Sequence, residues 1–226
     1  MARLHLVRHG QASFDKEDYD QLSDRGVAQA RLLGAWLADI GARPGALVAG
    51  ALKRHRQTAE SCVESWGVAA AVATDGGLDE FDHRELLDRF RPDLAGPGVL
   101  RRHLAADADP HRAFQKIFTA AVERWIGGAH DGDYRESWSG FRARCVAALD
   151  RAEGEDVWVF TSGGPIAAIL QHVLGVADRK AIELSWSVLN ASVTTLARGR
   201  SGLRLISFNG VGHLERAADT SLITSR

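Results

Sequence analysis

Apolar residues occur along this chain in two kinds of segment. Short, nearly continuous apolar runs stand at residues 4–7, 46–49, 70–72 and 156–161. Runs of this length without strict alternation are typical of strands buried on both faces of a parallel sheet. Between them apolar residues recur at helical spacing, first from the N-cap candidate Ser23 to Asp39 and then over residues 56–66. This order predicts a three-layer α/β/α fold with a mostly parallel central sheet.

The middle of the chain, about residues 82–154, has a different pattern. Prolines interrupt it, and apolar residues from Phe114 to Trp125 form one face of a predicted helix. A second helix is predicted to start at Ser137. We interpret this segment as a helical insertion within a single domain that spans residues 1–226.

The sheet pattern returns after the insertion and ends in a different arrangement. Residues 162–165 (Ser-Gly-Gly-Pro) are expected to open a helix, because proline suits the first helical turn. Two further strands, at 192–196 and 203–208, are joined by a glycine-containing connection and are predicted as an antiparallel pair of edge strands. The polar residues 217–226 are expected to form a tail without fixed structure.

Composition narrows the classes of partner. The net charge of −1 over 226 residues gives no reason to expect nucleic acid or an anionic membrane as a partner. No apolar run approaches the length of a membrane span, and no secretory signal precedes the first strand. Cys62 and Cys145, the two cysteines, are far apart and are expected to be reduced thiols. These features predict a cytoplasmic protein, and they leave open a monomer or a homodimer.

The first candidate chemistry is Arg8-His9-Gly10, directly behind the first strand. A strand that ends in this way brings an imidazole and a guanidinium to the carboxyl edge of a sheet, and Gly10 permits a tight turn and close approach of a ligand. The combination suits a nucleophilic histidine aimed at a phosphoryl group. By itself, however, the tripeptide is a weak signal.

Three later segments add groups at the same edge of the predicted sheet. Arg54 stands at the start of the helix after the second strand, where open α/β sheets bind ligands. Glu80 follows the third strand, and Ser162 and Gly163 follow the fourth with backbone N–H groups suited to an anion.

With these segments in view, the chain resembles the histidine phosphatase superfamily, in its phosphoglycerate-mutase-like branch. The likeness extends from Leu4 to about Leu214, and four stretches carry it in order and spacing: Leu-Val-Arg-His-Gly at 6–10, Leu-Ser-x-x-Gly-x-x-Gln-Ala at 22–30, Leu-x-Arg-x-x-Gln-Thr-Ala at 52–59, and Leu-x-Glu at 78–80. A phosphoglycerate-mutase-like fold is therefore expected.

The resemblance implies a phosphoryl transfer in two steps. His9 would attack phosphorus and become a transient phosphohistidine, while Arg8 and Arg54 hold the non-bridging oxygens. Glu80 would protonate the leaving alcohol and later activate water. No cofactor or metal is implied, and the partner is a small-molecule phosphate ester.

The departure from the family pattern is Ser162, because the family usually has a second histidine there. A serine can donate one hydrogen bond but brings no charge. Loss of such a donor costs on the order of 10²–10³ in rate where nothing compensates. His213, behind the last strand, is a possible substitute for the second histidine, although the sequence favours a partly buried structural histidine over direct catalysis.

Several residues keep a structural interpretation beside the functional one. Ser162 is equally compatible with capping the helix at Gly163 and with contacting phosphate, and Asp79 or Asp82 is expected to cap a helix. The neighbours of Arg54 are interpreted as a solvated helix face; these are Lys53, His55 and Arg56. Four aromatic residues are hypothesised to line the pocket: Phe14, Tyr19, Phe81 and Phe90.

Three functions follow from these observations. The sequence favours a metal-independent phosphatase acting on a small phosphomonoester. A catalytically weakened phosphate-binding or protein-interaction module is the alternative, with Ser162 as its support. A phosphoglycerate-type mutase is disfavoured, because residues 11–15 and 80–84 match neither of the stretches that mutases of this family carry.

Overall fold

A computed structural model of the chain describes residues 2–13 and 20–225. Its sheet consists of β1 (Ala2–Arg8), β2 (Ala46–Ala49), β3 (Val72–Thr74), β4 (Asp156–Thr161), β5 (Val193–Gly199) and β6 (Gly202–Gly210). The strand order is β3-β2-β4-β1-β5-β6. β1 to β4 are mutually parallel, and β5 and β6 are antiparallel to their neighbours. The predicted α/β fold with a mostly parallel sheet is confirmed.

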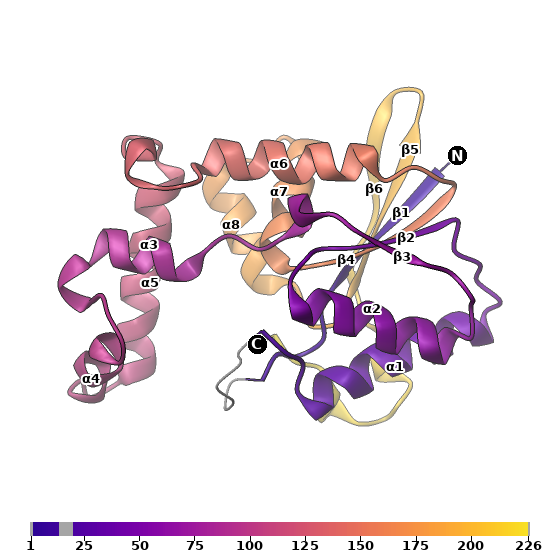
Figure 1. Cartoon of the computed structure of the whole chain (residues 1–226), viewed down its shortest axis with the longest axis horizontal. Helices are drawn as coiled ribbons and strands as arrows, with labels where there is room; N and C mark the ends of the chain where they lie inside the picture. Colours follow the sequence, from indigo (N-terminus) through magenta and orange to yellow (C-terminus); the bar gives the residue numbers. More distant parts are fainter. Residues whose placement is uncertain (1, 14–19, 226) are drawn as a thin grey trace. The chain divides into compact units, whose positions relative to one another are not determined.

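Helices cover both faces of this sheet, as the three-layer prediction requires. The α-helices of the described residues are α1 (Asp24–Asp39), α2 (Lys53–Trp66), α3 (His83–Phe90), α4 (Val99–Ala105), α5 (Pro110–Ile126), α6 (Trp138–Arg151), α7 (Gly163–Leu174), α8 (Asp178–Ser187) and α9 (Gly212–Glu215). α1 and α2 pack together on one face, and α7 lies on the other (Figure 1). Among the described residues, no helix combines the length and the apolar character that a membrane span needs.

The core between the sheet and α1 and α2 follows from the apolar pattern. Ser23 caps α1 by accepting a hydrogen bond from the Gly26 backbone, as expected. Leu33 and Leu37 are fully buried against Val7 of β1 and other core residues. Burying each such side chain contributes about 1.5–3 kcal/mol.

Gly10 and Gly26 bring the turn after β1 against the first turn of α1. A Cβ atom added at Gly10 would lie 2.3 Å from the Gly26 carbonyl oxygen, and one added at Gly26 would lie 2.2 Å from the Gln11 carbonyl oxygen. Two backbones therefore meet where any side chain would collide. Glycine is required at position 10 because the backbone of Gly26 approaches it closely. The sequence had predicted a close approach of a ligand instead.

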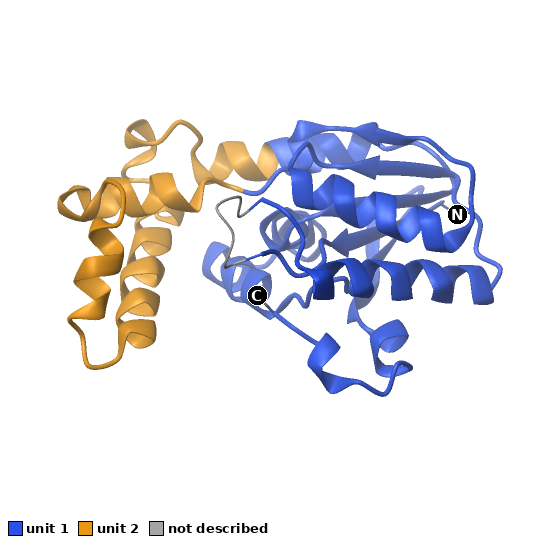
Figure 2. Ribbon diagram, turned by 60° about the horizontal axis from the view of Figure 1, so that its bottom comes forward, with its two compact units in different colours: residues 1–80, 144–226 blue, residues 81–143 orange. Residues whose placement is uncertain are grey.

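The chain divides into two compact units (Figure 2). One comprises residues 1–80 and 144–226, and contains the sheet. The other comprises residues 81–143, with an aromatic cluster of its own in which Trp125 lies 5.1 Å from Trp138 and 4.9 Å from Phe81 between ring centroids. The apolar face predicted on α5 is buried at Trp125, which is 1% exposed.

Two details of the C-terminal part differ from the prediction. β5 lies between β1 and β6, so β3 and β6 form the edges of the described sheet and β5 does not. The described part of the tail is also bound: the Gln29 amide donates to the Leu222 carbonyl at 2.7 Å, and the Asn190 N–H donates to the Thr224 carbonyl at 2.8 Å. The polar composition of the tail predicted no fixed structure. Its backbone carbonyl groups are instead held by hydrogen bonds from Gln29 and Asn190.

Candidate active site

The candidate residues meet at the carboxyl edge of the parallel strands. The His9 N–H donates to the Thr161 carbonyl at 2.8 Å, which extends the β1–β4 pairing by one residue and sets His9 beside the end of β4. The Gly50 N–H donates to the Phe160 carbonyl at 3.0 Å, and this bond brings the start of α2 to the same place. The strand register therefore assembles the site.

His9 is held as a neutral imidazole. Its Nδ1 atom lies 2.7 Å from the Gly10 carbonyl oxygen, which can only accept, so the ring proton is assigned to Nδ1. Arg54 Nε donates to His9 Nε2 at 3.2 Å, which agrees with a lone pair on that atom. Burial, followed by the charges of Arg54 and Arg8, holds the pKa of His9 well below its usual value. The ring, 7% exposed, therefore carries a nucleophilic lone pair at neutral pH.

Arg54 is fixed on both sides of its guanidinium. Besides its contact with His9, its Nη1 donates to Asp20 Oδ1 at 2.7 Å, and the other oxygen of Asp20 accepts from the Lys53 N–H at 2.8 Å. Thr58 donates its hydroxyl to the Arg54 carbonyl at 2.7 Å and accepts from the Gly10 N–H at 3.1 Å. These bonds join the turn at His9 and Gly10 to the first turn of α2.

Arg8 lies beside the start of α7. Its Nη1 donates to the Ser225 carbonyl at 3.0 Å and also to the Val188 carbonyl. Its Nε would be 3.9 Å from a Cβ atom added at Gly163. Arg8 and Gly163, two of the residues predicted from the sequence, therefore lie next to each other.

Glu80 reaches the same helix from the segment behind β3. Its Oε2 accepts from the Gly164 N–H at 3.1 Å, in the first turn of α7. Both neighbouring aspartates hold helix starts, as one of them was expected to do. Asp82 accepts from the Arg84 and Glu85 N–H groups of α3, and Asp79 accepts from the Ala51 and Leu52 N–H groups in front of α2.

Ser162 does not cap α7 with its side chain. Its hydroxyl is fully buried and lies 2.7 Å from Nε2 of His55. The interpretation of Ser162 as a helix cap is therefore wrong. The partner of its hydroxyl is His55, which was not a candidate site residue.

The prediction that His55 belongs to a solvated helix face is wrong, because its side chain is fully buried. α2 begins at Lys53, three residues earlier than expected, so position 55 falls on the face toward the sheet. Arg56 is exposed as predicted, and Lys53 is half-buried. A signal was present: His55 is in helical phase with Ala59, Cys62 and Trp66, all of them buried.

His213 makes its contacts with other residues than the candidate residues at the carboxyl edge. Its ring packs against Trp36 with centroids 6.1 Å apart and is hydrogen-bonded to the Ala191 backbone. Within the described residues, none of its recorded contacts is with His9 or Arg54. Desolvation, partly offset by that hydrogen bond, lowers its pKa to about 4. These contacts give it the character of a buried structural histidine.

The burial of His213 predicts that the free energy of unfolding decreases in acid. The unfolded chain binds a proton at His213 below about pH 6.5, but the folded chain does so only near pH 4, so acidification through this window favours unfolding. We expect His213→Gln to remove up to about 3 kcal/mol of the loss in unfolding free energy between pH 7 and pH 4. Urea unfolding at several pH values measures it. His172→Gln, at an exposed position of α7, is the matched control and should leave the pH slope unchanged.

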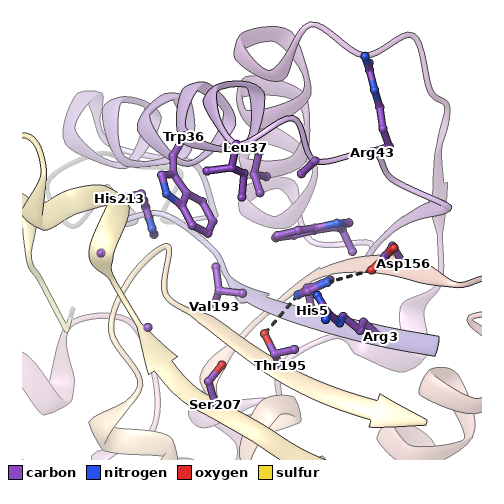
Figure 3. Close-up of a pocket in the computed structure, with 15 residues that line it drawn as sticks. Arg3, His5, Trp36, Leu37, Arg43, Asp156, Val193, Thr195, Ser207 and His213 are labelled. Carbon is purple, nitrogen blue, oxygen red and sulfur yellow. Dashed lines mark hydrogen bonds and ion pairs between the residues drawn. The ribbon is translucent and has the colours of Figure 1, made fainter. Parts of the chain in front are cut away.

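A surface cavity of about 530 Å³ lies beside β1. Its lining includes Arg3, His5, Trp36 and His213, and Figure 3 shows His5 bound to Asp156 and Thr195 there. The carboxyl-edge residues described above do not line it. Of the aromatic residues hypothesised for the pocket, Phe14 and Tyr19 lie outside the described residues, while Phe81 and Phe90 belong to the unit of residues 81–143.

Comparison with known proteins places this geometry in context. A family model described as the histidine phosphatase superfamily (branch 1) matches residues 4–96 and 102–210. No curated protein sequence matches the chain significantly. Phosphoglycerate mutase from Bacillus anthracis has a similar structure, with a TM-score of 0.67 and 18% identity over 96% of this chain and 97% of the mutase.

Two phosphatases are also similar in structure. Phosphoserine phosphatase from Entamoeba histolytica has a TM-score of 0.64 and 18% identity, over 95% of this chain and 100% of that protein. A mycobacterial glucosyl-3-phosphoglycerate phosphatase has a TM-score of 0.60 and 25% identity, over 93% and 99% of the two chains. Both phosphatases and a mutase thus share this fold.

Proposed function

The chain belongs to branch 1 of the histidine phosphatase superfamily, and we propose that it is a metal-independent phosphatase acting on a small phosphomonoester through a phosphohistidine at His9. The observation that carries this proposal is the state of His9. Its ring proton is directed to the Gly10 carbonyl, and its unprotonated Nε2 accepts from Arg54 Nε at 3.2 Å. A neutral imidazole with its lone pair beside a fixed guanidinium is suited to attack on phosphorus.

In the first step the Nε2 lone pair forms a bond to phosphorus and the bond to the ester oxygen breaks. An oxygen of the phosphoryl group would accept from Arg54 in place of Nε2, which releases the lone pair for the attack. Arg8 and Arg54 offset the charge on the non-bridging oxygens. The imidazole becomes positively charged, and the Gly10 carbonyl that accepts from Nδ1 stabilises that charge.

Glu80 supplies the proton for the leaving alkoxide and, as a carboxylate, takes a proton from water in the second step. Water then attacks phosphorus, the bond to Nε2 breaks, and inorganic phosphate leaves with His9 neutral again. The hydrogen bond that Glu80 accepts from the Gly164 N–H supports the role of Glu80. This bond anchors the carboxyl group at the start of α7, next to Ser162 and Gly163.

The test is hydrolysis of para-nitrophenyl phosphate and of a panel of phosphomonoesters in excess EDTA. We expect inorganic phosphate to be released at a rate that EDTA does not lower. A protein that binds tungstate but releases no phosphate from any ester would be a binding module. Conversion of 3-phosphoglycerate to its 2-isomer without phosphate release would show a mutase. Either result overturns the phosphatase proposal.

A further inference from the structure

Three side chains form a row behind the edge where the phosphoryl group is proposed to bind. Ser162 Oγ lies 2.7 Å from His55 Nε2, and His55 Nδ1 lies 3.6 Å from Asp79 Oδ1. Ser162 and His55 are fully buried, and the Asp79 side chain is 24% exposed. The row ends at a hydroxyl next to Gly163, on the strand end that pairs with His9.

The chain makes room for this row at Gly50. A Cβ atom there would lie 2.2 Å from His55 Nδ1 and 2.7 Å from Asp79 Oδ1. Asp79 is held in place by N–H donors from Ala51 at 2.6 Å and Leu52 at 3.2 Å. Burial alone would raise the pKa of Asp79, but His55 and these two amides outweigh it and lower the pKa below its usual value. A fixed carboxylate therefore stands on the Nδ1 side of His55.

His55 is neutral while the site is empty. Burial lowers its pKa most, Arg54 lowers it further, and Asp79 and Glu80 oppose them. The imidazole ring of His9 also faces His55, with ring centroids 5.7 Å apart. In the neutral form with its proton toward Asp79, Nε2 must accept from the Ser162 hydroxyl. The hydroxyl proton is then directed away from the phosphoryl position.

A bound phosphoryl anion changes this balance. Its negative charge offsets Arg54 and Arg8, the cations on this edge, and leaves the carboxylate of Asp79 to favour a charged imidazole. Protonated His55 carries a proton on each nitrogen, so that it pairs with the Asp79 carboxylate on its Nδ1 side and donates from Nε2 to Ser162. Once Ser162 accepts from Nε2, its own proton is free to be donated elsewhere.

We propose that His55 is a positioning residue of the phosphatase: it takes up a proton when a phosphoryl group binds, donates Nε2–H to Ser162, and so turns the Ser162 hydroxyl into a donor to the phosphoryl oxygens. This inference rests on the phosphatase activity proposed above. Serine itself carries no positive charge. In this proposal His55 of α2 supplies that charge, and the Ser162 hydroxyl lies between His55 and the phosphoryl group.

Proton uptake tests this arrangement without turnover. Tungstate is the probe, because it mimics phosphate and its own protonation does not change near neutral pH. Titration calorimetry at pH 7 in two buffers of different ionisation enthalpy gives the number of protons bound. We expect about one proton taken up by the wild type and none by His55→Gln, as the linkage of a newly charged group requires. His9→Gln, which removes the other ring, should retain the uptake.

The outcomes are separable from those of the phosphatase assay. Equal uptake by the wild type and His55→Gln, or no uptake by the wild type, overturns the role of His55 even if the enzyme hydrolyses esters. A wild type that fails to bind tungstate instead contradicts the phosphate site itself. Thermal unfolding shows whether His55→Gln is folded, and Ser162→Ala, a smaller change, should also lose most of the uptake because it breaks the row at its end.

Kinetics on an active enzyme give a second, independent readout. We expect Ser162→Ala and His55→Gln each to lower kcat by about 10²-fold with little change in KM, and the double variant to be no slower than the worse single one. Residues that act as a unit show such non-additivity. Multiplying effects in the double variant would contradict a shared role.

Discussion

His9→Ala is expected to abolish turnover. The variant should lose roughly 10⁴-fold or more in kcat, the order seen when the nucleophile of a covalent mechanism is removed. No neighbouring group can replace it in the described part of the chain, because the site histidine nearest to it, His55, has its Nε2 bound to Ser162. Initial rates with para-nitrophenyl phosphate measure the loss.

The same variant decides whether the intermediate is covalent. Rapid quench of the wild type with labelled substrate should trap acid-labile, alkali-stable label on the protein, and His9→Ala should carry none. His5→Ala is the matched control, since it removes a histidine in the middle of the same strand, where the ring stacks on Trp158 at 4.1 Å. Label on the His9 variant, or turnover close to wild type, would show that another residue is the nucleophile.

Replacing Arg54 is expected to have two separable effects. Arg54→Gln removes a donor fixed between His9 and Asp20, and we expect about 10²–10³-fold lower kcat at pH 8. Burial is the first cause of the low pKa of His9 and Arg54 the second, so loss of the charge raises that pKa. More of the imidazole is then protonated in mild acid, and the acid limb of the rate profile should move to higher pH.

Arg54→Lys separates charge from geometry. It keeps a positive charge near His9 but not the forked donor, so we expect a similar loss of rate with the acid limb closer to that of the wild type. Arg56→Gln, on the exposed side of the same helix, should change neither. pH–rate profiles of the four proteins from pH 5 to pH 9 are the measurement. An unshifted limb in Arg54→Gln would show that Arg54 does not control protonation of His9.

Much of this fold follows from local patterns. The strands at 46–49 and 156–161 have their predicted bounds, because the continuous apolar run in each case is the buried strand. Arg8, His9, Arg54, Glu80 and Ser162 come together at one edge, because parallel strands bring their carboxyl ends to one side. Their chemical roles remain predictions.

What the sequence did not reveal depends on distant contacts. The start of α2 has no side-chain cap of its own; Leu52 stands at the N-cap position, and Asp79, 27 residues later, accepts from its N–H. The early start places His55 inside the fold. The described part of the tail is likewise held by hydrogen bonds with Gln29 and Asn190, which no local pattern connects to it.

The bond from Arg8 to the Ser225 carbonyl has a consequence for biosynthesis. The two residues are 217 positions apart. At ~5–20 residues per second a ribosome needs roughly 10–40 s to make the intervening chain. A nascent chain therefore presents Arg8 and His9 long before Ser225 exists, and the bond between Arg8 and this carbonyl forms only after Ser225 has left the exit tunnel.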